Sequence, residues 1–124
     1  MPRVVHFEVP ADEPERAVTF YEGVFGWKIH RWDGPYDYWL ITTGKDNEPG
    51  INGGLMKRME PGQGVCNTVE VLSVDDSVQK VEAAEGKVVV PRMPIPGVGY
   101  LVYCQDTEGN MFGMMQPDEG AQAG

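Results

Sequence analysis

Hydrophobic and polar residues alternate in the first apolar segment, RVVHFEVP from Arg3 to Pro10. One face of this segment carries Val5, Phe7 and Val9, and the other carries Val4, His6 and Glu8. Such a period of two predicts a half-buried strand, with two ionisable side chains on the same face.

The segment from residue 11 to residue 27 has apolar residues at helical spacing. We expect an amphipathic helix in which Asp12 is the N-cap, Pro14 lies in the first turn and Gly26 ends the helix. Three short strands should follow, in WKIHRW, YDYWLITTG and INGGLMKR, because each run is rich in strand-forming residues and bounded by turn residues.

The same order then begins again. VCNTVEVL (residues 65–72) predicts a strand, and SVDDSVQKVEAAEG predicts a helix that Ser73 or Asp75 caps and Gly86 ends. Strands are expected in KVVVP, GYLVYCQ and NMFGMMQ. The segment PRMPIPGVGY (residues 91–100) is predicted to be a stiff loop that forms a rim or turns a corner, because it holds three prolines.

The two halves can be superposed in sequence. Glu8-Val9 falls on Glu70-Val71, Gly26 on Gly86, and residues 50–56 on residues 109–115. This repeat predicts an α+β fold of two βαβββ modules, about 1–60 and 61–117, within one domain (1–120). Paired curved mixed sheets would surround a cup with the helices outside, and residues 118–124 would form a flexible tail. An α+β sandwich with a coincidental internal similarity is the alternative.

Charge and cysteine content narrow the possible partners. The 124 residues carry a formal charge of −9, so we expect no nucleic-acid partner and no anionic membrane surface. No apolar run reaches the length of a spanning helix, and a cytoplasmic protein is expected. Cys66 and Cys104 form no CxxC pattern and are predicted to be free, buried side chains.

Two motifs carry a family resemblance, HFEVPADEPERAVTFYEGVFGWKI near the start and DTEGNMFGMMQ near the end. Together they resemble the glyoxalase, bleomycin-resistance and extradiol-dioxygenase superfamily, also called the vicinal oxygen chelate superfamily, and its small glyoxalase-like subgroup in particular. The resemblance implies a cup in which His and Glu side chains from the first and last strands of each module hold a divalent metal. Substrates of such enzymes chelate the metal, which acts as a Lewis acid.

The four metal-ligand positions that this resemblance implies are mostly unfilled. His6 matches the first, the second falls on Cys66 or Thr68, and the remaining two fall on Gly54 and Gly113. Glycine has no side-chain donor, so we expect no cofactor and no four-ligand metal site. An altered site for Zn, Ni, Mn or Fe stays open, with ligands His6, Glu8, Glu70 and Cys66.

A cup without a metal can bind a small molecule through shape and a few polar groups. His6 and Glu8 are the best candidates for a catalytic role. The predicted ligand-binding residues are His6, Glu8, Asn52, Gly54, Glu70, Tyr103 and Gly113. Strand parity allows either Tyr38 or Trp39 to join them, and Met56, Met114 and Met115 would add adaptable apolar surface.

The leading hypothesis is a glyoxalase-like protein that binds a small molecule without the family's metal site. A divalent-metal lyase, isomerase or dioxygenase with an altered ligand set is the first alternative. A dimeric scaffold or partner-binding module is the second alternative. A homodimer is expected from the resemblance.

Overall fold

The computed structural model describes residues 2–122. The order of strand, helix and three strands occurs twice, as predicted, and the protein has the predicted α+β fold. The elements are β1 (Arg3–Ala11), α1 (Pro14–Phe25), β2 (Lys28–Arg31), β3 (Tyr38–Thr42), β4 (Gly53–Lys57), β5 (Cys66–Glu70), α2 (Val74–Ala83), β6 (Lys87–Ile95), β7 (Gly99–Gln105) and β8 (Met111–Pro117).

The chain divides into two compact units. We call His6–Val65 the first module, and residues 66–122 together with residues 2–5 the second module. The strand β1 therefore begins in the second module and continues into the first.

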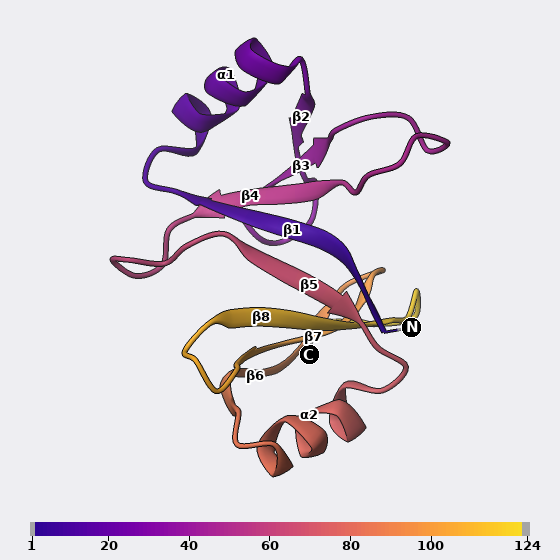
Figure 1. Cartoon of the computed structure of the whole chain (residues 1–124). Coiled ribbons are helices and arrows are strands. Elements are labelled where there is room, and N and C mark those ends of the chain that lie inside the picture. The colour runs from indigo at the N-terminus through magenta and orange to yellow at the C-terminus, as the bar shows by residue number, and fades with distance from the viewer. Residues whose placement is uncertain (1, 123–124) are drawn as a thin grey trace. The chain divides into compact units, whose positions relative to one another are not determined.

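The first module has strands in the order β2-β3-β4-β1, with β1 parallel to β4 and the other pairs antiparallel. Helix α1 covers one face of this sheet (Figure 1). The core between them is built around Ala11, Ile41 and Leu55, against which Phe7 and Trp39 pack. Because successive strand residues face opposite ways, His6, Glu8 and Tyr38 lie on the face away from α1.

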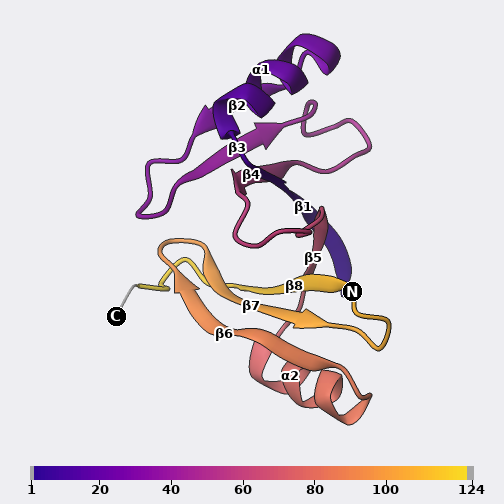
Figure 2. The ribbon, with the colours of Figure 1, turned by 90° about the vertical axis from the view of Figure 1, so that its left-hand side faces the viewer.

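The second module has strands in the order β5-β8-β7-β6, again with one parallel pair, β5 and β8. Helix α2 covers one face of this sheet (Figure 2). Its core includes Val74, Val102, Cys104 and Met114. Met114 thus belongs to the helix-facing core, and its predicted place on a ligand-binding surface is wrong.

Strand register fixes how the two modules correspond. Glu8 pairs with Gly54 in the first module, and Thr68 pairs with Gly113 in the second. The two helices begin 60 residues apart, at Pro14 and Val74, and the same offset joins Glu8 to Thr68 and His6 to Cys66. The predicted superposition of Glu8-Val9 on Glu70-Val71 is wrong by two residues, although the match of Gly54 with Gly113 is correct. A shift of two keeps each side chain on its face, so the alternating pattern could not reveal the error.

The N-cap residue of α1 differs from the predicted one, and that of α2 is one of the two predicted candidates. Glu13, and not Asp12, is the N-cap residue of α1, and its side chain makes no capping hydrogen bond. The Asp12 carboxylate instead accepts a hydrogen bond of 2.9 Å from Arg58 Nε, at the end of β4. Ser73 caps α2, because its hydroxyl accepts a hydrogen bond of 3.2 Å from the Asp76 N–H.

The two helices also end by different means. Gly26 adopts a left-handed conformation with φ of 70° and its N–H bonds to the Glu22 carbonyl, as expected of a glycine C-cap. After α2 the left-handed residue is Glu85, with φ of 73°. Gly86 serves close packing, since a Cβ there would lie 2.7 Å from the Gln105 carbonyl oxygen. The prediction that both glycines end their helices in the same way is therefore wrong for Gly86.

The proline-rich segment 91–100 is not mainly a loop, which corrects another prediction. Pro91 and Pro94 lie inside β6, and β7 begins at Gly99. β6 is an edge strand with two register shifts against β7, and edges and bulges are the places where a sheet tolerates proline.

Residues of the predicted tail also have defined partners. The Asp118 N–H donates to the Val98 carbonyl, the Gly97 N–H donates to the Ala121 carbonyl, and Ala121 is 2% exposed. Residues 123 and 124 lie outside the described residues.

Candidate functional site

Three polar side chains meet on the face of the first module that lies away from α1. His6 and Glu8 come from β1, and Tyr38 comes from β3. The Tyr38 hydroxyl donates a hydrogen bond of 2.8 Å to Glu8 Oε2 and lies 2.7 Å from His6 Nε2. We call these three residues the polar cluster.

Gly54 makes this cluster possible. Glu8 and Gly54 are register partners, and Tyr38 pairs with Met56 on the next strand, so Tyr38 reaches diagonally across β4. A Cβ at Gly54 would overlap the Tyr38 ring and hydroxyl. The phenol therefore takes the space that a side chain at position 54 would need, which explains why glycine is found there.

Proton positions in the cluster follow from the single proton of the phenol. Tyr38 gives that proton to Glu8, so its oxygen accepts from His6 Nε2–H. Burial lowers the pKa of His6, and the nearby Glu8 carboxylate opposes this shift by raising it. The ring is thus neutral at pH 7, and a neutral ring protonated on Nε2 leaves Nδ1 as an acceptor.

Glu8 is the most deeply placed member of the cluster, since only 5% of it is exposed. A buried carboxylate needs hydrogen-bond donors, and the phenol is one of them. His6 and Tyr38 are only partly buried, so these are the members of the cluster that an incoming molecule could reach.

A divalent metal does not fit among these side chains as they are arranged. Nitrogen and oxygen ligands lie about 2.0–2.2 Å from a zinc ion, whereas the Tyr38 oxygen stands between His6 and Glu8 at hydrogen-bonding distance from both. Gly54 adds no donor. Residues 2–122 contain no group of three or more His, Cys, Asp and Glu side chains with the geometry of a metal site.

The corresponding face of the second module has a different chemistry. A Cβ at Gly113 would lie 3.3 Å from Thr68 Oγ1 and 3.4 Å from the Tyr103 ring, so these three predicted residues do come together. Cys66 is buried and Thr68 is 4% exposed, while Glu70 lies two register pairs further along, opposite Met115. A histidine and a carboxylate are thus replaced by a thiol and a hydroxyl.

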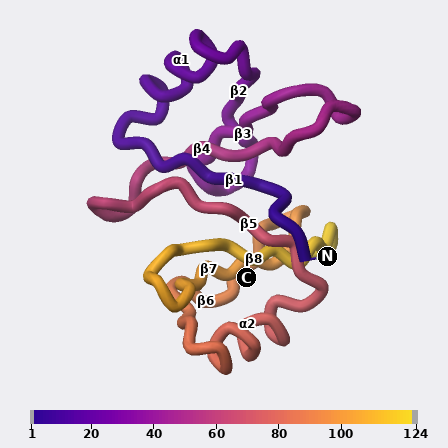
Figure 3. The backbone as a smooth tube through the Cα atoms, in the orientation of Figure 1, coloured from indigo at the N-terminus to yellow at the C-terminus, as the bar shows by residue number. Residues whose placement is uncertain are grey.

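Asn52, another predicted ligand-binding residue, lies outside the polar cluster. Its side-chain oxygen accepts a hydrogen bond of 2.9 Å from the Thr43 N–H, and it is exposed. This contact closes the long β3–β4 loop, which extends away from the strands in Figure 3. The structure therefore gives Asn52 a role in holding the loop.

Sequence reasoning missed an aromatic loop next to the cluster. Trp32 and Tyr36 lie in the β2–β3 connection with their rings stacked, 6.1 Å between centroids. The Trp32 ring also meets the edge of Tyr38, with 6.3 Å between centroids. Two aromatic residues on either side of the Gly34-Pro35 turn were the available signal.

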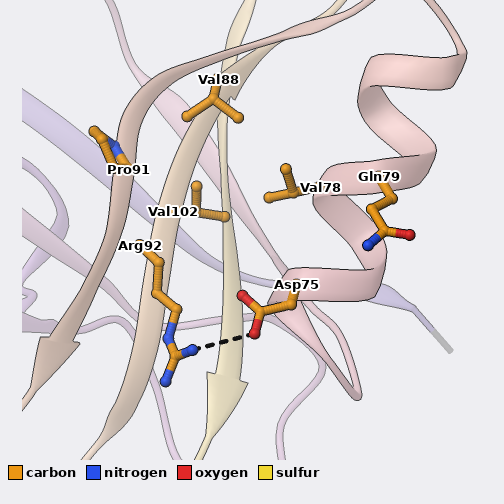
Figure 4. Close-up of a pocket in the computed structure, with 7 residues that line it drawn as sticks. All are labelled: Asp75, Val78, Gln79, Val88, Pro91, Arg92 and Val102. Carbon is orange, nitrogen blue, oxygen red and sulfur yellow. Dashed lines mark hydrogen bonds and ion pairs between the residues drawn. The ribbon is translucent and has the colours of Figure 1, made fainter.

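A shallow hollow of about 350 Å³ lies between α2 and the sheet of the second module. Figure 4 shows Val78 on the helix and Val88 and Val102 on the strands, with the ion pair between Arg92 and Asp75 at one side. None of the predicted site residues lines it.

Comparisons with known proteins agree with this architecture. The family model described as Bleomycin resistance protein-like N-terminal matches residues 3–44. A glyoxalase/bleomycin resistance protein/dioxygenase superfamily member from Vibrio splendidus is similar in structure with a TM-score of 0.67, at 18% identity, over 95% of this chain and 100% of that chain. This chain has the fold of that superfamily. The resemblance found in the sequence is confirmed at this level.

Other solved structures share the superfamily fold. A variant of Streptomyces coelicolor methylmalonyl-CoA epimerase in complex with 2-nitronate-propionyl-CoA has a TM-score of 0.70 at 13% identity, covering 98% of this chain and 99% of that chain. Methylmalonyl-CoA epimerase from Mycobacterium tuberculosis has a TM-score of 0.68 at 14% identity, covering 93% and 87%. No curated protein matches the chain. Among residues 2–122, no helix is long and apolar enough to cross a membrane.

Proposed function

We propose that this protein binds a small molecule at the polar cluster of the first module, without a divalent metal between His6 and Glu8. The observation that carries the proposal is the Tyr38 hydroxyl, bonded to Glu8 Oε2 and within 2.7 Å of His6 Nε2. A phenol in this place turns a pair of potential metal ligands into a hydrogen-bonded chain.

The cluster can recognise a ligand by accepting a proton or a hydrogen bond. In the neutral His6 ring, Nδ1 is an acceptor. The other ring nitrogen begins a hydrogen-bonded chain that runs from Nε2–H through the Tyr38 phenol to the Glu8 carboxylate. A positive charge gained on the imidazole would be stabilised by the Glu8 carboxylate, which opposes the larger effect of burial that lowers the pKa of His6. His6 is thus suited to bind a hydrogen-bond donor or to act as a general base.

The metal-dependent alternative requires a rearrangement. A lyase, isomerase or dioxygenase that used His6 and Glu8 as ligands would need the Tyr38 hydroxyl to leave both of them, with the loss of two hydrogen bonds. Glu70 and Cys66, the other members of that ligand set, lie in the second module. The scaffold alternative assigns no use to the cluster. A homodimer stays a prediction from the resemblance.

Thermal unfolding of tag-free protein with a metabolite panel, in buffer with and without EDTA, tests the proposal. We expect at least one compound to raise the midpoint equally in both buffers. This effect should be reduced in Tyr38→Phe and His6→Asn and retained in full in Tyr100→Phe, a matched tyrosine change in the second module. A shift that needs added Zn, Ni, Mn or Fe would support the metal enzyme instead. If no compound stabilises the protein, the scaffold hypothesis gains and the proposal fails.

A further inference from the structure

We propose that Trp32 and Tyr36 form a stacking surface beside the polar cluster, and that the ligand is a planar ring bearing an uncharged N–H donor. This inference rests on the proposed function and specifies the chemical class of its ligand.

The backbone places Trp32 on the same face as the cluster. Arg31 is the register partner of Trp39, and the next residue, Trp32, donates its N–H to the Tyr38 carbonyl at 2.8 Å. Trp32 and Tyr38 are therefore cross-strand neighbours, and such neighbours project from the same face of a sheet. The tryptophan ring meets the Tyr38 ring edge-on, so the aromatic loop and the polar cluster share a side chain.

The loop holds its two rings in a fixed arrangement. The Gly34 backbone lies against the Trp32 ring so closely that a Cβ at Gly34 would overlap it. An ion pair between Arg31 and Asp37 closes the base of the loop. Tyr36 stacks on Trp32 with 23° between the ring planes, yet the tyrosine is 45% exposed. A rigid exposed aromatic side chain loses little conformational entropy when a ligand stacks on it.

The cluster selects the polar part of the ligand. The neutral His6 ring offers an acceptor nitrogen, and the Glu8 carboxylate stands behind the phenol. An anionic ligand would be repelled by this carboxylate and by the protein charge of −9. A donor such as an amide N–H matches the acceptor without a second charge, whereas a carboxylate offers only more acceptors.

Three small probes separate the two parts of this inference. Benzamide has a planar ring and an N–H donor, cyclohexanecarboxamide keeps the amide without the aromatic ring, and benzoate keeps the ring with a negative charge. Titrations followed by ligand-observed saturation-transfer NMR give their relative affinities. We expect benzamide to bind about 3- to 10-fold more tightly than cyclohexanecarboxamide, the range that one aromatic contact supplies. It should also bind more tightly than benzoate, because the Glu8 carboxylate repels an anion.

Variants identify which residues cause each preference. Tyr36→Leu, at an exposed loop position that should not affect folding, and Trp32→Leu should both remove the preference for benzamide over cyclohexanecarboxamide. His6→Asn should reduce the preference for benzamide over benzoate and leave the aromatic preference intact. Equal binding of all three probes, no detectable benzamide binding, or an aromatic preference unchanged in Tyr36→Leu and Trp32→Leu would each overturn the inference.

The failure of this inference can be told from failure of the proposed function. If panel compounds stabilise the wild type through His6 and Tyr38 but bind equally well to Tyr36→Leu, only the stacking surface is wrong. If no panel compound and no probe binds, both proposals fail.

Discussion

Replacing Tyr38 by phenylalanine removes one oxygen atom from the polar cluster and keeps the aromatic ring. That oxygen donates to the Glu8 carboxylate and accepts from His6. A hydrogen bond to a charged group contributes about 1.5–3 kcal/mol, and one between neutral groups about 0.5–1.5 kcal/mol. Because Glu8 is only 5% exposed, water replaces the phenol poorly. We therefore expect the free energy of unfolding to fall by about 2–4 kcal/mol.

Urea unfolding followed by circular dichroism measures this loss. The expected change is a lower midpoint at an unchanged dependence of free energy on urea, since the surface exposed on unfolding stays the same. Tyr36→Phe is the control, because Tyr36 is 45% exposed, and surface changes of this kind usually alter stability by less than about 0.5 kcal/mol. If Tyr38→Phe is as stable as this control, the phenol does not hold Glu8 and His6 together, and the reasoning is refuted.

Three further predictions follow from the same geometry. Gly54→Ala should destabilise the protein strongly, but only weakly in a Tyr38→Ala background, while Gly113→Ala should be mild because its Cβ would lie 3.3 Å or more from its neighbours. Urea midpoints of the four variants test this prediction. Additive effects of Gly54→Ala and Tyr38→Ala would contradict the overlap. Because the folded-state pKa of His6 is lowered, unfolding free energy should be steady above the unfolded value of about 6.5 and fall as the pH drops toward the folded value. His6→Asn should flatten that part of the urea-midpoint profile, and an unchanged slope would show that another group titrates. Glu85→Gly should raise the unfolding free energy by about 0.5–1 kcal/mol, because Glu85 has φ of 73°, and a lower thermal midpoint for this variant would contradict the strain assigned to it.

The strands, helices and faces were predictable because alternation and helical spacing report which side chains are buried. His6 and Glu8 were placed on one face of the first strand by this pattern alone, and the structure confirms it. Gly54 and Gly113 were matched correctly because both precede apolar residues in similar runs. The local sequence was thus enough to predict the order of helices and strands and the two glycine positions that offer no side-chain metal ligand.

Register and cross-strand partners were not predictable, because they depend on how separate strands pair. The Glu-Val dipeptides suggested a correspondence that is two residues out, and the helix starts together with the pairing of Thr68 with Gly113 reveal it. Tyr38 and Trp39 could not be separated until pairing across β3 and β4 showed that Trp39 packs toward α1. The sequence showed that Gly54 lacks a ligand, but not that a tyrosine from another strand takes its space.

The metal content of tag-free protein, after incubation with excess Zn or Ni and gel filtration, tests the central claim most directly. That claim is that the Tyr38 phenol takes the place between His6 and Glu8 where a metal would be held. We predict that the wild type retains less than roughly one tenth of an equivalent of metal, as expected of weak surface binding alone. His6→Ala should retain the same amount. About one equivalent of metal in the wild type, lost in His6→Ala, would contradict the account.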